Sequence, residues 1–120
     1  MKTTTFGTVM IVHLNLALRI NKLSATALGK AMGVTQSSLQ RTLGGDTDMS
    51  VSRMYDICHH ADISAAYIMT EACKSAEILK DNGWSIVEKA ESDDLLQLWK
   101  AREDWSWETP ICDIFKLAIK

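Results

Sequence analysis

The sequence has no apolar run long enough to span a membrane. Of its 120 residues, 47% are hydrophobic and 23% are charged, which is ordinary for a globular protein. An apolar stretch near the N-terminus is interrupted by His13, Asn15 and Arg19, whereas a membrane helix needs roughly 18 apolar residues in a row. That stretch follows Lys2, as in a signal peptide, but no small-residue cleavage site comes after it. We therefore expect a cytoplasmic protein that does not associate with membranes.

Cysteine is scarce. The three cysteines, Cys58, Cys73 and Cys112, are odd in number and widely spaced, which indicates reduced thiols rather than a disulfide framework. His59 and His60 directly follow Cys58, but three consecutive residues of a helix point in different directions and do not have the spacing of zinc ligands. We expect no metal site and no cofactor.

The sequence also lacks the patterns of a catalytic site. No nucleophile is paired with a base, and no glycine-rich loop has the spacing that cradles a phosphate. Adjacent carboxylates occur at 93–94 and 103–104, but helix N-caps and solvated surfaces explain such pairs better than acid–base catalysis does. We expect no catalytic residues and no enzyme activity.

The net charge is only −2, but its distribution is uneven. Residues 1–60 carry six basic and three acidic side chains, a net +3, and residues 61–120 carry seven basic and twelve acidic ones, a net −5. A mildly basic half beside an acidic half fits a module that faces nucleic acid next to one that faces solvent or a protein partner.

Helix signals are abundant in the first two thirds of the chain. Residues 1–8 read as a polar arm, and apolar residues then recur at helical spacing between 9 and 22. Capping residues predict further helices at 25–32, at 36–43, from Ser50 or Ser52 to about 60, and from Ser64 to about 81. We expect an all-α fold of five helices with a small, mostly helical C-terminal extension.

Asn82 and Gly83 form the clearest break and predict a boundary between a domain at 1–82 and a segment at 83–120. Within that segment, residues 84–91 suit either a short helix or a strand, and helices are expected to begin at 92–94 and 109–110. The segment is acidic and rich in large aromatic residues, which suit a dimer or partner interface, with a local core as the alternative. The interface candidates are Trp84, Trp99, Trp105, Trp107 and Phe115.

Residues 23–45 meet the steric demands of two helices joined by a tight turn. Gly33 can supply the left-handed conformation of the turn, and Gly29 is small where the two helices must touch. The residues expected to fill the core between the helices are Leu28, Met32, Val34 and Leu39.

With these features, residues 9–69 resemble the lambda-repressor-like (Cro-like, Xre-like) helix-turn-helix transcriptional regulators. The resemblance implies a DNA-binding domain whose third helix enters the major groove. One departure is Ala25, which stands where many members have a glutamine that contacts a phosphate. The matching positions are Leu23, Ser24, Leu28, the Gly-Val-Thr-Gln run at 33–36, Ser38, Leu39 and a glycine at 44 or 45, followed by residues 54–58 and 61–63.

The resemblance also implies a set of DNA contacts. Side-chain chemistry agrees with it, because glutamine can bond bidentately to adenine and arginine to guanine. The implied base contacts are Gln36, Ser37, Gln40 and Arg41, and the implied phosphate contacts are Thr35, Ser38, Thr42, Lys30, Arg19 and Lys22.

The sequence therefore predicts a sequence-specific DNA-binding transcriptional regulator. We expect a repressor of the phage or prophage type, or an autoregulatory repressor, that binds an inverted repeat in double-stranded DNA as a homodimer. Two alternatives stay open. One is an antitoxin that represses its own operon and binds a toxin through the C-terminal segment. The other is a protein-interaction module that has lost DNA binding, which the low positive charge and Ala25 favour.

Overall fold

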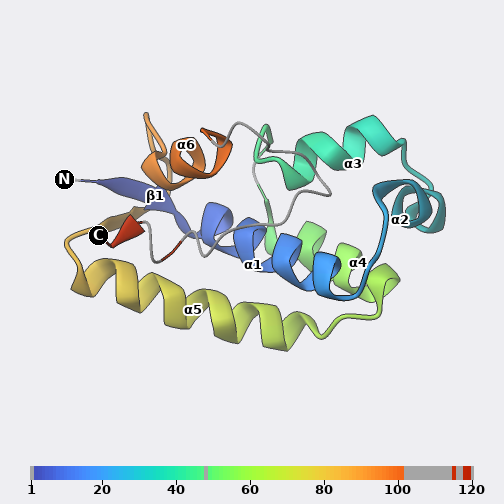
Figure 1. The fold of residues 1–120 in the computed structure, drawn as a ribbon, viewed down its shortest axis with the longest axis horizontal. Helices are drawn as coiled ribbons and strands as arrows, with labels where there is room; N and C mark the ends of the chain where they lie inside the picture. The colour runs from blue at the N-terminus through green and yellow to red at the C-terminus, as the bar shows by residue number, and fades with distance from the viewer. Residues whose placement is uncertain (1, 48, 102–114, 116–117, 120) are drawn as a thin grey trace.

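The computed structural model describes residues 2–47, 49–101, 115, 118 and 119. These residues form six α-helices and two short strands (Figure 1), which confirms the expectation of a mainly helical fold. The helix start predicted at 109–110 lies outside the described residues. None of the described helices has both the length and the apolar character needed to cross a membrane. The elements are β1 (Thr3–Thr5), α1 (Phe6–Ile20), α2 (Ala25–Met32), α3 (Gln36–Leu43), α4 (Val51–Ala61), α5 (Ala65–Asp81), β2 (Ser85–Val87) and α6 (Asp94–Lys100).

Hydroxyl side chains begin four of these helices where the sequence predicts them. Ser24, Thr35, Ser50 and Ser64 each accept a hydrogen bond of 3.0–3.1 Å from the backbone N–H three residues later. Each bond satisfies a donor that has no partner within its own helix. The start of α4 is therefore set by Ser50 and not by Ser52.

The N-terminal residues that were expected to form a polar arm are part of the fold. β1 pairs in parallel with β2, with Thr3 opposite Ser85 and Thr5 opposite Val87. The Thr5 hydroxyl then caps α1 by accepting a hydrogen bond from the Thr8 N–H at 3.2 Å. Threonine is β-branched and suits a strand, but a strand of three residues becomes recognisable only once its distant partner is known.

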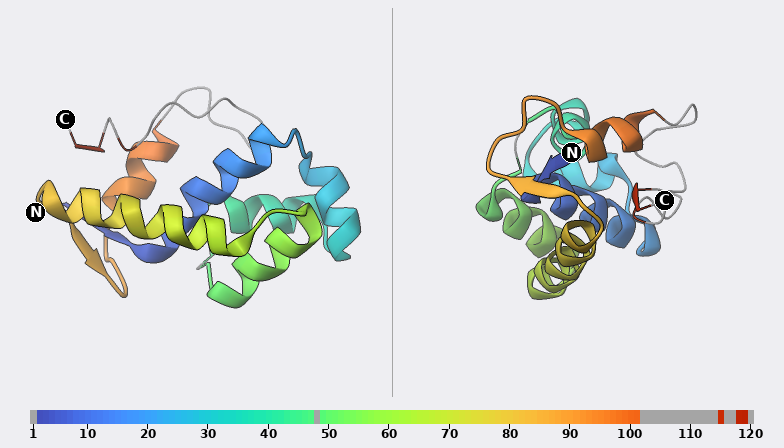
Figure 2. Two further views of the ribbon diagram at one scale, coloured as in Figure 1. Left: turned by 90° about the horizontal axis from the view of Figure 1, so that it is seen from below. Right: turned by 90° about the vertical axis from the view of Figure 1, so that its left-hand side faces the viewer.

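One hydrophobic core runs through the described part of the chain. α1 lies in the middle of it and α5 packs along α1 (Figure 1). Side chains from beyond the break at Asn82 belong to the same core, among them Trp84, Leu95 and Trp99. The boundary predicted at 82 therefore does not separate two cores, and residues 84–101 pack as part of one unit with the helices before them. The views in Figure 2 place the strands at one end of this unit and α2 at the other.

The Asp93 carboxylate ties α6 to both the N-terminal strand and α1. Asp93 accepts a hydrogen bond from the Thr4 hydroxyl at 2.6 Å and another from the Thr8 hydroxyl at 2.5 Å. It also caps α6, because it accepts from the Leu96 N–H at 3.1 Å. The helix start predicted at 92–94 is confirmed, and its attachment to β1 and α1 explains why this segment folds against the rest of the molecule.

Candidate nucleic-acid interface

α2 and α3 are joined by a tight left-handed turn at Gly33. Gly33 has a φ of 71°, and the Val34 N–H returns to the Gly29 carbonyl at 2.9 Å. A Cβ atom on Gly29 would lie 3.0 Å from the Val34 carbonyl oxygen, so a larger residue here would require the turn to shift by a few tenths of an ångström. Both glycine roles predicted from the sequence are confirmed, and together they fix the direction in which α3 leaves α2.

One face of α3 is held by apolar packing. Leu39 and Leu43 are buried in the core together with Leu28 of α2. Met32 and Val34 pack against the same cluster while remaining partly exposed. The core predicted for this motif is therefore confirmed, and the other face of α3 is left to solvent.

The solvent face of α3 carries the four residues predicted to contact bases. Gln36, Ser37 and Arg41 are exposed, and Gln40 is partly exposed. The Thr26 hydroxyl of α2 donates a hydrogen bond to Gln36 Oε1 at 2.9 Å, which orients the amide and leaves that oxygen a second lone pair for a base. Sequence reasoning missed Thr26, because no local pattern links it to a residue across the turn.

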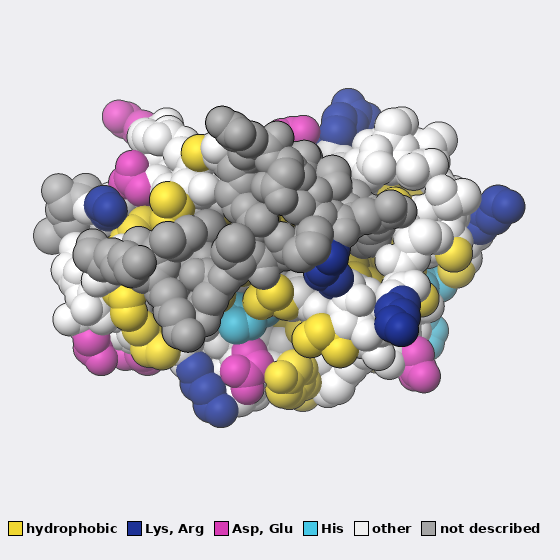
Figure 3. Space-filling view, viewed as in Figure 1, with side chains coloured by type: hydrophobic (Ala, Val, Ile, Leu, Met, Phe, Trp, Pro, Cys, Tyr) yellow, Lys and Arg dark blue, Asp and Glu magenta, His cyan; other side chains and the backbone are white. Residues whose placement is uncertain are grey.

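Basic side chains surround this face. Residues 1–45 contain five basic and no acidic residues; Lys2 lies over the Trp84 ring, and the other four are on α1, α2, α3 and the loop between α1 and α2. Figure 3 shows Lys and Arg side chains spread over the end of the molecule where α2, α3 and the end of α1 lie. Such a region attracts a polyanion even when the net charge of the protein is slightly negative. Five of the six predicted phosphate contacts are at least partly exposed: Arg19, Lys22, Lys30, Thr35 and Ser38.

Two positions of the motif are buried and do not face DNA. Thr42 is 8% exposed and its hydroxyl donates to the Ser38 carbonyl at 3.2 Å, so its prediction as a phosphate contact is wrong. The sequence signal for this burial was the spacing of Thr42 from Leu39, which places both on one face of a helix. Ala25 is 1% exposed, so this position contributes packing at the start of α2.

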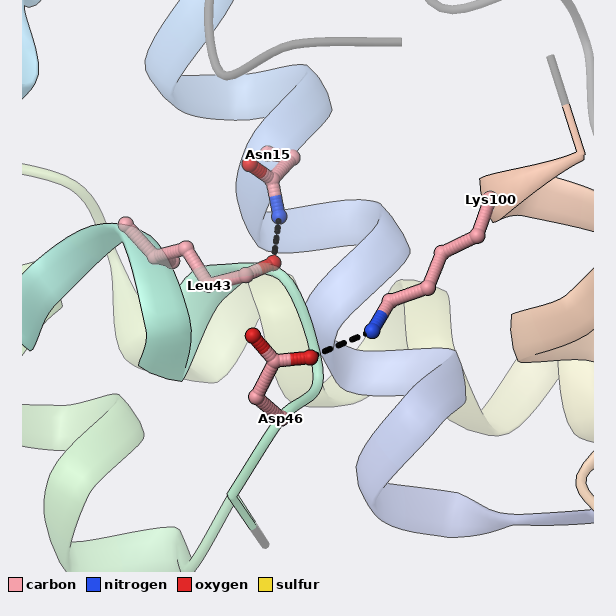
Figure 4. A network of polar contacts seen from close by, with 4 residues as sticks. All are labelled: Asn15, Leu43, Asp46 and Lys100. Atoms are coloured by element: carbon pink, nitrogen blue, oxygen red, sulfur yellow. Dashed lines mark hydrogen bonds and ion pairs between the residues drawn. The ribbon is translucent and has the colours of Figure 1, made fainter. Parts of the chain in front are cut away.

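The C-terminal end of α3 is held by two other helices (Figure 4). The Asn15 side chain of α1 is buried and donates to the Leu43 carbonyl at 3.0 Å and to the Ile11 carbonyl at 2.8 Å. Lys100 of α6 forms an ion pair with Asp46, which lies in the loop after α3. From the sequence, Asn15 was only an interruption of an apolar stretch, and nothing marked Lys100, because both act on partners far away in the chain.

The residues predicted for a dimer or partner interface include two that are internal. Trp84 is 5% exposed and Trp99 is 1% exposed, and the Trp84 indole N–H donates to the Ala118 carbonyl at 3.0 Å. Their assignment to an interface is therefore wrong, and the alternative of a local core is correct for both. Phe115 is partly buried and stacks on His13, with the ring centroids 5.0 Å apart. Trp105 and Trp107 lie outside the described residues.

Two titratable side chains outside α2 and α3 have shifted pKa values. His13 Nε2 lies 2.7 Å from the Ser75 hydroxyl oxygen, and burial lowers the pKa of His13, an effect that Glu71 partly opposes. Burial raises the pKa of the Cys58 thiol, and Cys73 is exposed. Within the described ranges, no group of three or more His, Cys, Asp or Glu side chains is placed to hold a metal ion.

The chain matches no family model, no curated protein and no solved structure. The assignment of a function therefore depends on the arrangement of α2 and α3 and on the side chains that α3 presents to solvent.

Proposed function

We propose that this protein is a sequence-specific DNA-binding transcriptional regulator that uses α3 as its recognition helix. The observation that carries the proposal is the division of α3 into two faces. Leu39 and Leu43 fasten one face to the core, while the other presents polar side chains and no large apolar one: Gln36, Ser37, Gln40 and Arg41. A short helix that is packed along one side and exposed along the other can present its polar side chains to a binding partner.

The chemistry of the open face suits the major groove of DNA. That groove is about 12 Å wide and admits one α-helix. Glutamine pairs with the N6 and N7 edge of adenine, arginine with the O6 and N7 edge of guanine, and serine with either. Lys22 and Lys30 stand on the neighbouring loop and helix, where they can reach phosphates and fix the position of α3 without specifying sequence.

We further propose that the protein binds as a homodimer to an inverted repeat. A single small domain buries less surface than tight specific binding needs, and a two-fold dimer contacts two half-sites about one helical turn apart. Because Trp84 and Trp99 are internal, the dimer would form through other parts of the surface. The biological role that fits best is a repressor of the phage or prophage type or an autoregulatory repressor. An antitoxin would share the DNA-binding surface and differ in carrying a toxin, which would copurify with it.

Selection of bound duplexes from random DNA tests the proposal. The purified full chain is expected to enrich one motif, arranged as an inverted repeat, and to bind it more tightly than a scrambled duplex of the same composition. If no sequence is enriched at low salt, the proposal fails, and a protein-interaction module becomes the better interpretation.

A matched pair of charge variants locates the DNA surface. Ser37 and Ala66 are both exposed and are the second residues of α3 and α5. A glutamate is tolerated at such a position, since it lies at the positive end of the helix dipole. Ser37→Glu is expected to weaken binding to the selected duplex by at least about tenfold, because it places a like charge against the phosphates. Ala66→Glu adds the same charge at the start of α5, outside the α2–α3 unit, and is expected to bind as the wild type does.

A further inference from the structure

α6 lies directly against the loop that ends α3. Gly45 has a φ of 82°, and a Cβ atom added there would lie 2.6 Å from Leu96 Cδ1, so the Leu96 side chain rests on the Gly45 backbone. One turn further along α6, Lys100 pairs with Asp46. Residues four apart on a helix share a face, so one face of α6 contacts two consecutive residues of this loop, Gly45 and Asp46.

The loop at 44–46 is hydrogen-bonded to the part of α3 that would contact the bases of DNA. The Gly44 N–H donates to the Gln40 carbonyl at 2.8 Å, and the Asp46 N–H donates to the Arg41 carbonyl at 3.0 Å. Gln40 and Arg41 are two of the four residues that we propose as base contacts. A displacement of the loop would therefore pull on the backbone that carries them.

α6 is itself fixed, so it can act as a support. Its N-terminal end is bound through Asp93 to Thr4 and Thr8, and its Leu95 and Trp99 side chains are buried in the core. In addition, the Asn15 side chain of α1 bonds to the Leu43 carbonyl. The end of α3 is thus held by a buried amide of α1 and, through the loop that follows it, by α6 (Figure 4).

We propose that Leu96 and Lys100 are positioning residues for DNA recognition: they hold the loop at 44–46 and through it the end of α3 that carries Gln40 and Arg41. This inference rests on the proposed function, because it assigns α6 a part in the same binding event. Its physical basis is preorganisation, since a side chain that must meet a base edge within a fraction of an ångström loses affinity when its helix can move.

Plain electrostatics makes a different prediction for the Asp46–Lys100 pair, and this allows a sharp test. If the two charges acted only through their field on DNA, Asp46→Ala would tighten binding and Lys100→Ala would weaken it. If they act by holding the loop, both substitutions weaken binding to the selected duplex. An exposed ion pair contributes little, so we expect a loss of about two- to fivefold for each, and no further loss in the double variant, because each single change already breaks the pair.

The salt dependence of binding separates positioning from a direct phosphate contact. Removal of a lysine that contacts a phosphate makes the slope of log affinity against log salt less steep by about 1. We expect Lys100→Ala to keep the wild-type slope. Lys80→Ala is the matched control, because Lys80 pairs with Glu77 on α5, at the opposite end of the molecule from α2; it is expected to leave affinity and slope unchanged.

Hydrogen exchange in the free protein provides a reading that needs no DNA. The amides of Gly44 and Asp46 are expected to exchange faster in Lys100→Ala and in Leu96→Ala, but not in Lys80→Ala. Three results would overturn the inference and leave the proposed function intact: tighter DNA binding by Asp46→Ala, a less steep salt dependence for Lys100→Ala, or wild-type affinity for the selected duplex in both Asp46→Ala and Lys100→Ala. A wild-type chain that enriches no DNA sequence would overturn both.

Discussion

Single polar residues inside this fold find their partners on distant segments. Asn15 satisfies the last carbonyl of α3, and His13 bonds to Ser75 on α5. The helical spacing of apolar residues predicted the helices that carry these two side chains. That spacing contains no information about which helix lies opposite. For this reason the base-contact positions could be placed from the sequence, whereas the residues that support them, Thr26 and Asn15 in particular, could not.

His13 predicts a pH dependence of stability. Burial lowers the pKa of His13 in the folded state, against a smaller opposing effect of Glu71, so the folded protein holds the neutral ring. An unfolded histidine takes up a proton near pH 6.5. Stability from this group is therefore fully present above that pH and is lost as the pH falls below it, through the lower pKa of the folded state. Urea unfolding at pH 7.5 and 5.5 is expected to show a larger loss of stability in the wild type than in His13→Gln. Equal losses in the two proteins would contradict this prediction.

Helices and strands differ in how far they could be predicted. Helices with a hydroxyl cap or a C-terminal glycine carry their boundaries locally, and α2, α3 and α5 begin where Ser24, Thr35 and Ser64 predict. β1 has no such local mark, because its partners are distant: its backbone pairs with β2, and its Thr3 N–H and Thr4 hydroxyl bond to Asp94 and Asp93 at the start of α6. A three-residue strand therefore looks like a polar arm until its partner is known.

Asp93 links these elements, and its removal is expected to destabilise the protein by about 2–4 kcal/mol, the sum of a lost helix cap and of hydroxyl groups left without an acceptor. Thr4, one of the two donors, is fully buried. Asp93→Asn keeps one acceptor oxygen and is expected to lose clearly less stability than Asp93→Ala. The measurement is the free energy of unfolding in urea at pH 7. Equal stability of Asp93→Ala and the wild type would show that the link contributes nothing.

At the scale of the whole molecule, the boundary predicted at Asn82 coincides with the end of a helix, and the described side chains beyond it belong to the same core as the helices before it. α5 ends at Asp81, and Gly83 takes a positive φ, which is all that a turn signal can predict. The following segment packs against the helices before it only if its apolar side chains meet a complementary surface there. Trp84 and Trp99 do so, and they close the core that α1 and α5 leave open at that end.

A chain truncated after Asn82 is therefore expected not to fold. Losing one buried tryptophan side chain costs about 3–5 kcal/mol, and a domain of this size has a total stability of about 5–15 kcal/mol, so losing two of them together with β2 removes most of it. Far-UV circular dichroism on heating is expected to show little helix and no cooperative transition. A truncated chain that melts cooperatively near the wild-type temperature would mean that residues 1–82 form an independent domain after all.

The most direct test of the central claim is the effect of Arg41→Ala on the affinity for two duplexes, the selected site and a scrambled one of equal length. Arg41 is exposed on the open face of α3. If it reads a base, the loss on the selected site is about 1–3 kcal/mol, while the scrambled duplex is bound nearly as before. An equal loss on both duplexes would make Arg41 a phosphate contact only, and no loss on either would mean that α3 does not enter the groove.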